Sequence, residues 1–471
     1  MARLMESEET YFSTVRGMCR HCRRIVPARI FFKAGKVWQQ SICEKHRDNK
    51  PALIAGDMHW YLENAIAGRQ DHSPLKKAEP LSKGCPHDCG PCAWHATPCQ
   101  LPVISITNAC NLDCPICFTY NRKDRIYNMT VDEMRRTVAW ILESSGPVDL
   151  VNITGGEPTL HPELLEILKV CSNPGIGRIT MNSNGLLLAK DKKLCAKLAD
   201  LGVYVILSFD TFDPETSVLL HGRDIVEQKL KAVENLTAAG VRMTLLNVLV
   251  RGVNENSISK ILGMMKENDK ILSLTVQTMT YTGQGGSSFL EREHLPADEA
   301  TRIVCRESAG ELQSGDFSTR PSAHPLCYMT CYMLKSGDKF LPFARFVPEE
   351  KLKSMMSDSY LLRLENEKDF FKDTINELYA KGDSGQLGVF RELVELLYPG
   401  DRAITMFERQ RLAESSVRTV YIHSHMDEDN FDCSRAMLCP DLVPSEPGRL
   451  IPACTYNLFY RMKDERFYVG K

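Results

Sequence analysis

The feature that most constrains this chain is a group of three cysteines, Cys110, Cys114 and Cys117, in a C-x3-C-x2-C spacing. The group follows the apolar run 103–107, which reads as a buried strand, so we expect the cysteines in the loop at that strand's carboxyl end. Iron–sulfur cubes are normally held by four cysteine thiolates. Three thiolates can therefore hold three irons of a 4Fe–4S cube and leave the fourth iron open to a ligand, much as catalytic zinc sites keep one open position.

A second motif stands at the end of the next predicted strand. The apolar run 148–154 ends in Gly155-Gly156-Glu157-Pro158. Two glycines let the backbone approach a ligand closely, and a carboxylate can accept hydrogen bonds from an ammonium group. The alternative for the cysteines is a zinc knuckle or a structural cluster, but zinc sites prefer paired C-x2-C units with a fourth ligand. The two motifs together favour a cluster that works with a bound cofactor.

These motifs resemble those of the radical S-adenosylmethionine (SAM) enzymes. The resemblance implies that the open iron chelates the amino and carboxylate groups of SAM. It also implies that one electron cleaves SAM to a 5′-deoxyadenosyl radical, which takes a hydrogen atom from substrate. Cys110, Cys114 and Cys117 are then the catalytic residues. The family's usual aromatic residue before the last cysteine is Ile116 here, and Phe118 follows the motif. The implied cofactor-binding residues are Phe118, Gly155, Gly156, Glu157, Asn184, Ser208 and Asp210.

Composition narrows the class of protein. The 471 residues are 43% hydrophobic and 25% charged with a net charge of −2, which gives no bulk electrostatic case for nucleic acid. No run of about 18 apolar residues predicts a membrane span, and the amino terminus lacks an apolar signal core, so we expect a cytoplasmic protein. The 18 cysteines fall in short-spaced groups, which favours metal binding over disulfides.

From Leu101 onward, predicted strands and helices alternate. We predict strands at 102–107, 148–154, 177–182, 203–209, 241–249 and 272–278. The first predicted helix, 130–144, opens with a Thr130-x-x-Glu133 capping box, and the second opens with Pro162. Further helices are predicted near 189–200, 223–239 and 256–268. Six such units predict an α/β fold with a partial (β/α)6 barrel over 101–280, which the radical SAM resemblance also implies.

In barrels the chemistry lies at the carboxyl ends of the strands. Asn184 follows the third predicted strand, and Ser208 and Asp210 end the fourth. By resemblance these residues contact the methionine carboxylate and ribose of SAM. Roles as turn or cap residues are the open alternative, because Asn-Gly is also good turn chemistry.

An amino-terminal module, residues 11–70, contains two ligand pairs joined by a predicted hairpin over 25–40. Four ligands at this spacing fit one tetrahedral zinc or a mononuclear iron, and the spacing does not choose between the metals. The last ligand, a histidine, could instead be a solvated side chain. The ligands would be Cys19, Cys22, Cys43 and His46.

Two more cysteine groups predict auxiliary clusters. Residues 71–100 contain a linker and a second C-x3-C-x2-C without a preceding strand, for which a second zinc site is the alternative. Residues 281–471 are predicted to be an α-rich auxiliary-cluster and substrate region, helical over 345–412, with a flexible loop at 282–286. A buried cysteine core is the alternative there, and Cys433 is a spare candidate. The expected 4Fe–4S ligands are Cys85, Cys89, Cys92 and Cys99 in the first group, and Cys327, Cys331, Cys439 and Cys454 in the second.

The order of these parts, from Cys19 to Asn457, resembles the archaeal tetraether lipid synthase group, also described as pterin methyltransferase-like. The resemblance implies a mononuclear metal and extra clusters, an electron donor such as flavodoxin or ferredoxin, and a transferase of lipid biosynthesis. The implied reaction joins two hydrocarbon chains by a carbon–carbon bond. The alternatives are radical methylation or modification of a small pterin-like molecule or peptide, and, less favoured, an iron–sulfur electron carrier.

A lipid substrate would need a long apolar tunnel, and it would allow peripheral contact with a membrane. One amphipathic segment has the apolar spacing to line such a tunnel, although this spacing is equally typical of an ordinary core. Its residues are Leu352, Met355, Met356, Leu361 and Leu362.

Overall fold

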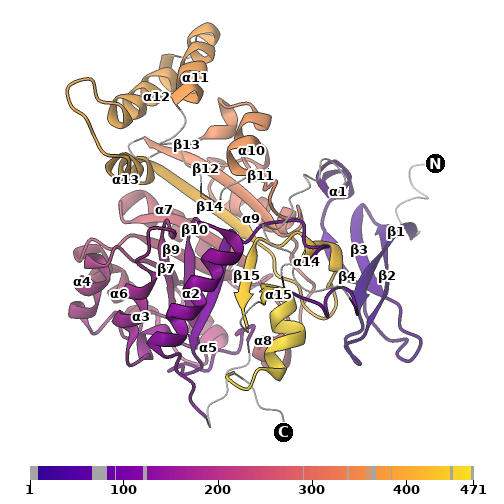
Figure 1. Cartoon of the computed structure of the whole chain (residues 1–471). Helices are drawn as coiled ribbons and strands as arrows, with labels where there is room; N and C mark the ends of the chain where they lie inside the picture. The colour runs from indigo at the N-terminus through magenta and orange to yellow at the C-terminus, as the bar shows by residue number, and fades with distance from the viewer. Residues whose placement is uncertain are drawn as a thin grey trace.

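The computed structural model describes residues 9–65, 82–90, 92–119, 125–289, 291–336, 339–357, 360–361, 368–382, 384–445 and 449–467. A large mixed sheet lies at the centre, a small antiparallel sheet lies beside it at the amino-terminal end, and a group of carboxyl-terminal helices stands apart from both (Figure 1).

Six parallel strands in sequence order form the middle of the large sheet, which confirms the predicted α/β fold with its (β/α)6 units. The strands are β5 (Leu101–Thr107), β6 (Val151–Gly155), β7 (Ile179–Ser183), β8 (Tyr204–Ser208), β9 (Met243–Leu249) and β10 (Ile271–Thr278). The helices that connect them are α2 (Val131–Ser145), α3 (Leu164–Cys171), α4 (Lys192–Asp200), α5 (Pro214–His221), α6 (Val226–Ala238) and α7 (Ser257–Glu267).

Local sequence signals explain where these helices begin. The Thr130 side chain accepts from the Glu133 amide at 3.2 Å, and the Glu133 carboxylate accepts from the Thr130 amide at 2.7 Å, so the predicted capping box is present. Helix α5 was not predicted from the sequence. It begins at Pro214, and the Asp213 side chain caps it by accepting from the Thr216 amide at 2.7 Å.

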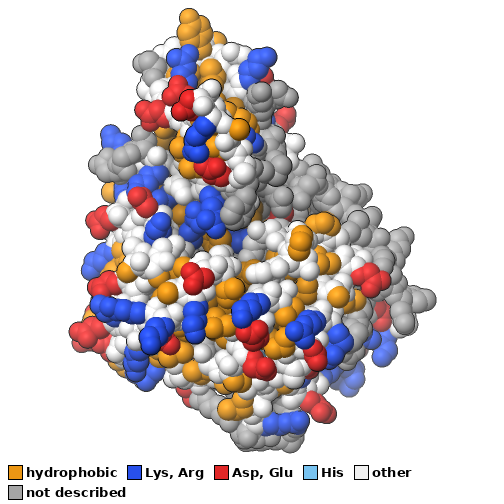
Figure 2. Space-filling model, turned by 60° about the vertical axis from the view of Figure 1, so that its left-hand side comes forward, with side chains coloured by type: hydrophobic (Ala, Val, Ile, Leu, Met, Phe, Trp, Pro, Cys, Tyr) orange, Lys and Arg blue, Asp and Glu red, His pale blue; other side chains and the backbone are white. Residues whose placement is uncertain are grey.

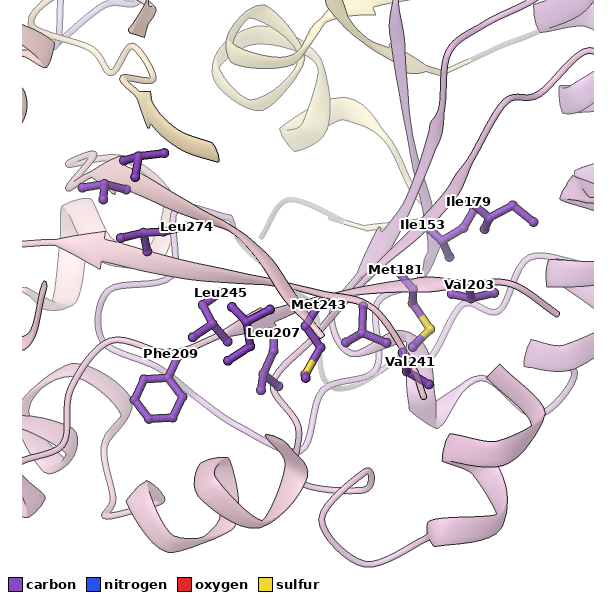
Figure 3. Packing of buried hydrophobic residues seen from close by; sticks show 14 of the residues in the cluster. Ile153, Ile179, Met181, Val203, Leu207, Phe209, Val241, Met243, Leu245 and Leu274 are labelled. Atoms are coloured by element: carbon purple, nitrogen blue, oxygen red, sulfur yellow. The ribbon is translucent and has the colours of Figure 1, made fainter. Parts of the chain in front are cut away.

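The main hydrophobic core lies between the parallel strands and their helices. Leu207, Met243 and Leu245 point from their strands towards the helices (Figure 3), and each is at most 1% exposed. Burying such side chains is the dominant favourable contribution to folding. Because this outer face carries the core, the opposite face of the same strands is left to line an interior space.

The carboxyl-terminal region adds strands at both edges of the large sheet, although the sequence predicted an α-rich region. Strand β14 (Val417–His423) pairs in parallel with β10, and β15 (Asp441–Pro444) pairs in parallel with β5. The remaining strands pair antiparallel farther out: β12 (Tyr328–Ser336) with β14, β11 (Ser318–Thr319) and β13 (Lys339–Pro342) with β12, and β16 (Leu450–Pro452) with β15. Leu101 and Asp441, which pair between β5 and β15, are 340 residues apart in the chain and yet share one sheet.

The predicted helices over 345–412 are present and form a hydrophobic cluster of their own. They are α10 (Glu349–Ser357), α11 (Lys368–Lys381), α12 (Ser384–Leu397) and α13 (Met406–Ser416). Leu352 and Met356 are buried in this cluster and Met355 packs against it. The expectation that this segment lines a lipid tunnel is therefore wrong for these residues. Leu361 is not among the residues that line the central cavity, and Leu362 lies outside the described residues.

The small sheet consists of four antiparallel strands in sequence order, which are β1 (Thr10–Met18), β2 (Ile25–Lys33), β3 (Lys36–Ser41) and β4 (Ala52–Ala55). Helix α1 (Met58–Ala65) follows. Strands β2 and β3 are the predicted hairpin over 25–40. The Gln39 amide donates to the Phe431 carbonyl at 2.8 Å, which ties this sheet to the carboxyl-terminal region.

The surface carries both signs of charge. On the face shown in Figure 2, basic and acidic side chains are interspersed over the lower part of the molecule, as the small net charge suggests. Within the described ranges, no helix combines the length and the apolar character that a bilayer span requires.

Candidate active site and metal centres

A cavity of about 350 Å³ lies between the loop that follows β5 and the inner face of the parallel strands. Its wall includes side chains from all six strands of the barrel and from the carboxyl-terminal region. The structure brings every sequence-predicted catalytic and cofactor residue to this cavity. These are Cys110, Cys114, Cys117, Phe118, Gly155, Gly156, Glu157, Asn184, Ser208 and Asp210.

The three cysteines of the loop act on one another electrostatically, as groups in one site do. Burial raises the pKa of the Cys114 thiol to about 12, and the neighbouring Cys117 and Cys110 add to this rise. The cation of Lys229 opposes it. Soft thiolates converging on one cavity fit an iron–sulfur cluster, and the set of three fits a cluster with one iron left open.

The Gly-Gly-Glu segment is hydrogen-bonded along the cluster loop. The Gly156 amide donates to the Thr107 carbonyl at 2.8 Å, and the Glu157 amide donates to the Ala109 carbonyl at 2.7 Å. A Cβ on Gly156 would lie 2.2 Å from the Ala109 carbonyl oxygen. A side chain at position 156 would therefore collide with the backbone of the cluster loop. Glycine is required there by packing as well as by any ligand.

The Glu157 side chain lines the cavity and is also an internal brace. It is 1% exposed and accepts from the Thr159 hydroxyl at 2.6 Å, the Ser183 hydroxyl at 2.9 Å and the Asn184 amide at 2.7 Å. The Thr159 amide is a fourth donor, at 3.2 Å. With four donors from its own chain, this carboxylate fixes the turn after β7 against the Gly-Gly segment. The backbone of this segment remains the part that can receive the cofactor's ammonium group.

Asn184, Ser208 and Asp210 have partners that fix their positions at the strand ends. The Asn184 side-chain amide donates to the Asn111 side-chain oxygen Oδ1 at 2.7 Å, which ties the third strand to the cluster loop. The Asp210 carboxylate accepts from the Val248 amide at 2.6 Å, and burial raises its pKa to about 6.

Lys229 on helix α6 is a functional candidate that sequence reasoning missed. It is 3% exposed, and its ammonium donates to the Ser208 hydroxyl and carbonyl, each at 2.6 Å. Burial lowers its pKa, while Asp210, Cys114, Glu157 and Cys110 oppose that shift. A buried cation beside the cluster thiolates favours their ionised form. The only sequence signal is a lysine on the apolar face of an amphipathic helix.

The glycine-rich segment predicted as a flexible loop at 282–286 is a short helix, α8 (Gly283–Ser288). The Gly285 amide donates to the Cys117 carbonyl at 2.6 Å, and a Cβ on Gly283 would lie 2.4 Å from the Phe118 carbonyl oxygen. Glycine is needed here because the helix packs directly on the backbone of the cluster loop.

The amino-terminal ligands meet as predicted. The donor atoms of Cys19, Cys22, Cys43 and His46 all lie within 4.8 Å of one another. The Cys22 and Cys43 sulfurs are 4.0 Å apart, and His46 Nδ1 is 3.5 Å from the Cys19 sulfur. Zinc–sulfur bonds of about 2.3 Å in a tetrahedron place sulfurs about 3.8 Å apart, so the set fits one tetrahedral metal ion.

The first auxiliary group is corrected by the structure. Cys85 interacts with Cys89, Cys92 and Cys433, and the hydrogen bond from the Cys85 thiol lowers the pKa of Cys433. Cys99, the expected fourth ligand, lies instead in the main hydrophobic core, where Asp441 is the charged group that acts on it. Cys433 opens helix α14 (Cys433–Met437), 348 residues from Cys85, so spacing alone could not identify it. Four thiols together fit a fully ligated cube.

The second auxiliary group contains three of its four expected cysteines. Cys327, Cys439 and Cys454 act on one another, and Arg435 donates to the Cys327 sulfur at 3.3 Å. Cys331 lies within strand β12 and faces Asp316 and Cys305. Residues four apart in a strand are about 13 Å apart, too far for one cube. His425 Nδ1, at 3.3 Å from the Cys454 sulfur, is the candidate fourth donor.

Comparison with known proteins agrees with this site. The sequence model of the Radical SAM superfamily matches residues 104–265, which span β5 to α7. The 7,8-dihydro-6-hydroxymethylpterin dimethyltransferase of Methanocaldococcus jannaschii is 26% identical over 490 residues, which cover 96% of this chain and 95% of that protein. The GTP 3′,8-cyclase of Chlorobaculum tepidum is 35% identical over 179 residues, covering 37% of this chain and about half, 52%, of that protein.

Among solved structures, Streptococcus suis SuiB bound to its precursor peptide SuiA is 22% identical with a TM-score of 0.39, covering 45% of this chain and 46% of that one. Membership in a family rests on the sequence match over the barrel together with the three-cysteine loop and the Gly-Gly-Glu segment at one cavity. The chain belongs to the radical SAM superfamily and is a radical SAM enzyme.

Proposed function

We propose that this enzyme takes a hydrogen atom from a small, polar, pterin-like heterocycle and so initiates its methylation or a related modification at carbon. The observation that carries this proposal is the character of the central cavity. Its wall is mixed, with apolar side chains such as Val103, Leu246 and Val248. Among them it presents a set of polar side chains, which are Asn152, Asn182, Thr275 and Gln277 from the strands and His423 from the carboxyl-terminal region. Ligand sites for drug-sized molecules span about 300–1,000 Å³, and this cavity of about 350 Å³ falls in that range.

When bound, the cluster supplies the electron that cleaves SAM to the 5′-deoxyadenosyl radical. The chain's own residues position the reactants around it. The backbone of Gly155 and Gly156 lines the cavity beside the three cysteines, and Asn184, Ser208 and Asp210 continue that wall. The radical carbon must lie roughly 3–4 Å from the hydrogen it takes, so this wall must fix both molecules together.

Coupling of lipid chains is the other candidate, and it now has less support. It was motivated by the resemblance to the tetraether group and by the segment around Leu352, which is part of a separate hydrophobic cluster. The relative from Methanocaldococcus jannaschii, of which the alignment covers 95%, is named for a pterin substrate.

The test is hydrogen transfer from labelled substrate. Anaerobically reconstituted enzyme would be incubated with SAM, dithionite and a deuterated 7,8-dihydropterin, and 5′-deoxyadenosine would be examined by mass spectrometry. Deuterium in 5′-deoxyadenosine supports the proposal, and Cys114→Ala is the control that should form none. Deuterium arriving only from labelled isoprenoid lipid would overturn the heterocycle proposal in favour of lipid coupling.

A further inference from the structure

One carboxylate on the cavity wall has an oxygen without a hydrogen-bond partner in the described part of the chain. Asp441, the first residue of β15, is 4% exposed and lines the cavity. The Tyr328 hydroxyl donates to its Oδ2 atom. Oδ1 is buried, and no donor among the described residues hydrogen-bonds it. The Cys439 thiol donates to the backbone carbonyl of Asp441 and does not satisfy the side chain.

Such an oxygen requires an explanation. Nearly all buried polar atoms in native proteins are hydrogen-bonded, and leaving one unpaired costs free energy, more so when the group is charged. Asp441 is part of the cavity wall, so a molecule bound in the cavity can supply the missing donor. An ionised carboxylate only accepts hydrogen bonds, so the molecule must present N–H or O–H groups.

The surroundings of Asp441 suit a flat molecule. The rings of His423 and Tyr360 line the cavity with it. Tyr328 stacks on His423 with ring centroids 4.2 Å apart and planes inclined by 14°. Tyr328 also meets Tyr360 edge-on at 6.4 Å. These contacts fix the orientation of the Asp441 carboxylate and of the rings beside it, so the recognition site is formed before a ligand binds.

A second unpaired acceptor lies on the same wall. Asn182 Oδ1, from strand β7, is buried without a hydrogen-bond partner in the described part of the chain. Two unpaired acceptors, contributed by separate strands, indicate that the ligand carries more than one donor. A hydrocarbon chain offers none.

We infer that Asp441 recognises the donor edge of a 2-amino-4-oxopyrimidine ring, the part that pterins and guanines share. In that ring, the 2-amino group and the adjacent ring N–H point the same way and match the two oxygens of one carboxylate. Each carboxylate oxygen can accept two hydrogen bonds, so Oδ2 can accept from the ring as well as from the Tyr328 hydroxyl. This inference rests on the proposed function and names the part of the heterocycle that the enzyme reads.

Binding measurements test it from the ligand side and from the protein side. Equilibrium dialysis of the anaerobically reconstituted enzyme with SAM would compare 7,8-dihydropterin with 7,8-dihydrolumazine, in which an oxygen replaces the 2-amino group. Wild-type enzyme should prefer the pterin by about tenfold to a hundredfold, because a hydrogen bond to a charged group is lost. Asp441→Asn should lose most of that preference, and the two losses should not add.

A matched control is Asp298→Asn. Asp298 is 5% exposed, accepts from the Gly56 amide at 3.0 Å and does not line the cavity. This variant should keep the preference for the pterin. Iron content and thermal midpoint would establish that each variant is folded, and the comparison of ligands on wild-type enzyme needs no variant at all.

The outcomes separate this inference from the proposed function. If dihydropterin binds but is not preferred over dihydrolumazine, or if Asp441→Asn keeps the preference, the role of Asp441 is overturned and the proposed function stands. If guanosine binds more tightly than dihydropterin and depends on Asp441, the role of Asp441 holds and the pterin class falls. If neither ring binds the wild-type enzyme, both proposals fall.

Discussion

The Phe118 ring stacks on the His425 ring, with centroids 5.2 Å apart and planes inclined by 17°. Phe118 follows the last cysteine of the cluster loop, and His425 comes from the segment after β14. The column continues from His425 to His423 at 4.1 Å and from His423 to Tyr328 at 4.2 Å. The cluster loop and the second auxiliary group are thus joined by a row of packed rings, and the carboxyl-terminal region completes the cavity wall.

The first prediction concerns the fourth ligand of the first auxiliary group. Cys433→Ser should lower the iron content of the reconstituted protein by up to four atoms per chain, because a cube needs its thiolates. Cys99→Ser is the matched control and should keep the iron, since Cys99 lies in the hydrophobic core. Iron and sulfide analysis would decide. Loss of iron in Cys99→Ser alone would contradict the assignment.

The second prediction uses two cysteines of one short motif. Cys327→Ser should lose the iron of the second auxiliary group, because its sulfur lies with those of Cys439 and Cys454. Cys331→Ser should keep that iron and show only the destabilisation of a polar change in a buried strand. Mössbauer or paramagnetic resonance spectra of both variants would be compared. Equal loss of signal in both would mean that strand β12 rearranges when the cluster binds.

The third prediction decides whether His46 is a ligand. His46→Ala should weaken binding of the amino-terminal metal and lower the thermal midpoint, because metal binding contributes to folding. His21→Ala is the matched control, since its ring lies 5.3 Å from that of His46 but is outside the four-ligand group. Elemental analysis after dialysis would identify the metal as zinc or iron. Full retention of metal by His46→Ala would show that the histidine is solvated.

The fourth prediction concerns the brace at Glu157. Glu157→Gln places an amide N–H₂ where the Thr159, Ser183 and Asn184 donors now point, so unfolding free energy should fall by about 1–3 kcal/mol. Urea denaturation would measure this. Glu166→Gln, an exposed side chain paired with Lys169, should stay within about 0.5 kcal/mol of wild type. A Glu157→Gln variant of full stability that no longer binds SAM would instead mark a direct cofactor contact.

The fifth prediction concerns pH and the buried His294. Its imidazole donates to Asp427 at 2.8 Å, and although burial lowers its pKa, Asp427 and Asp429 raise it above its usual value. Arg20, paired with Asp429 at 3.1 Å, and Glu291 are the other charges nearby. A raised pKa gives stability that is full below the unfolded value of about 6.5 and is lost as pH rises through the folded value.

Wild-type enzyme should therefore have a larger unfolding free energy than His294→Gln, and this difference should be larger at pH 6 than at pH 9. Urea denaturation at the two pH values would measure the difference. A gap that is the same at both pH values would show that His294 is neutral in the folded protein and acts only by packing.

Local sequence was sufficient wherever one short segment contains the whole signal. Alternation of apolar runs predicted the six strands β5 to β10, because a parallel strand is buried on both faces and its composition shows this. The three cysteines of the cluster loop could be found because they lie within a stretch of eight residues. Thr130 and Glu133 could be found because a capping box is local. The knuckle of Cys19, Cys22, Cys43 and His46 was found for the same reason.

Tertiary structure decided everything that depends on segments distant in sequence. Cys433 rather than Cys99 joins Cys85, and β14 and β15 extend the two edges of the sheet, because long-range packing brings these segments together without any fixed spacing. The sequence also cannot show which hydrogen-bond donors surround a buried side chain. Glu157 is occupied by donors of its own chain, whereas Asp441 keeps one oxygen unpaired beside the cavity. A carboxylate becomes a brace or a binding group according to which donors the fold places around it.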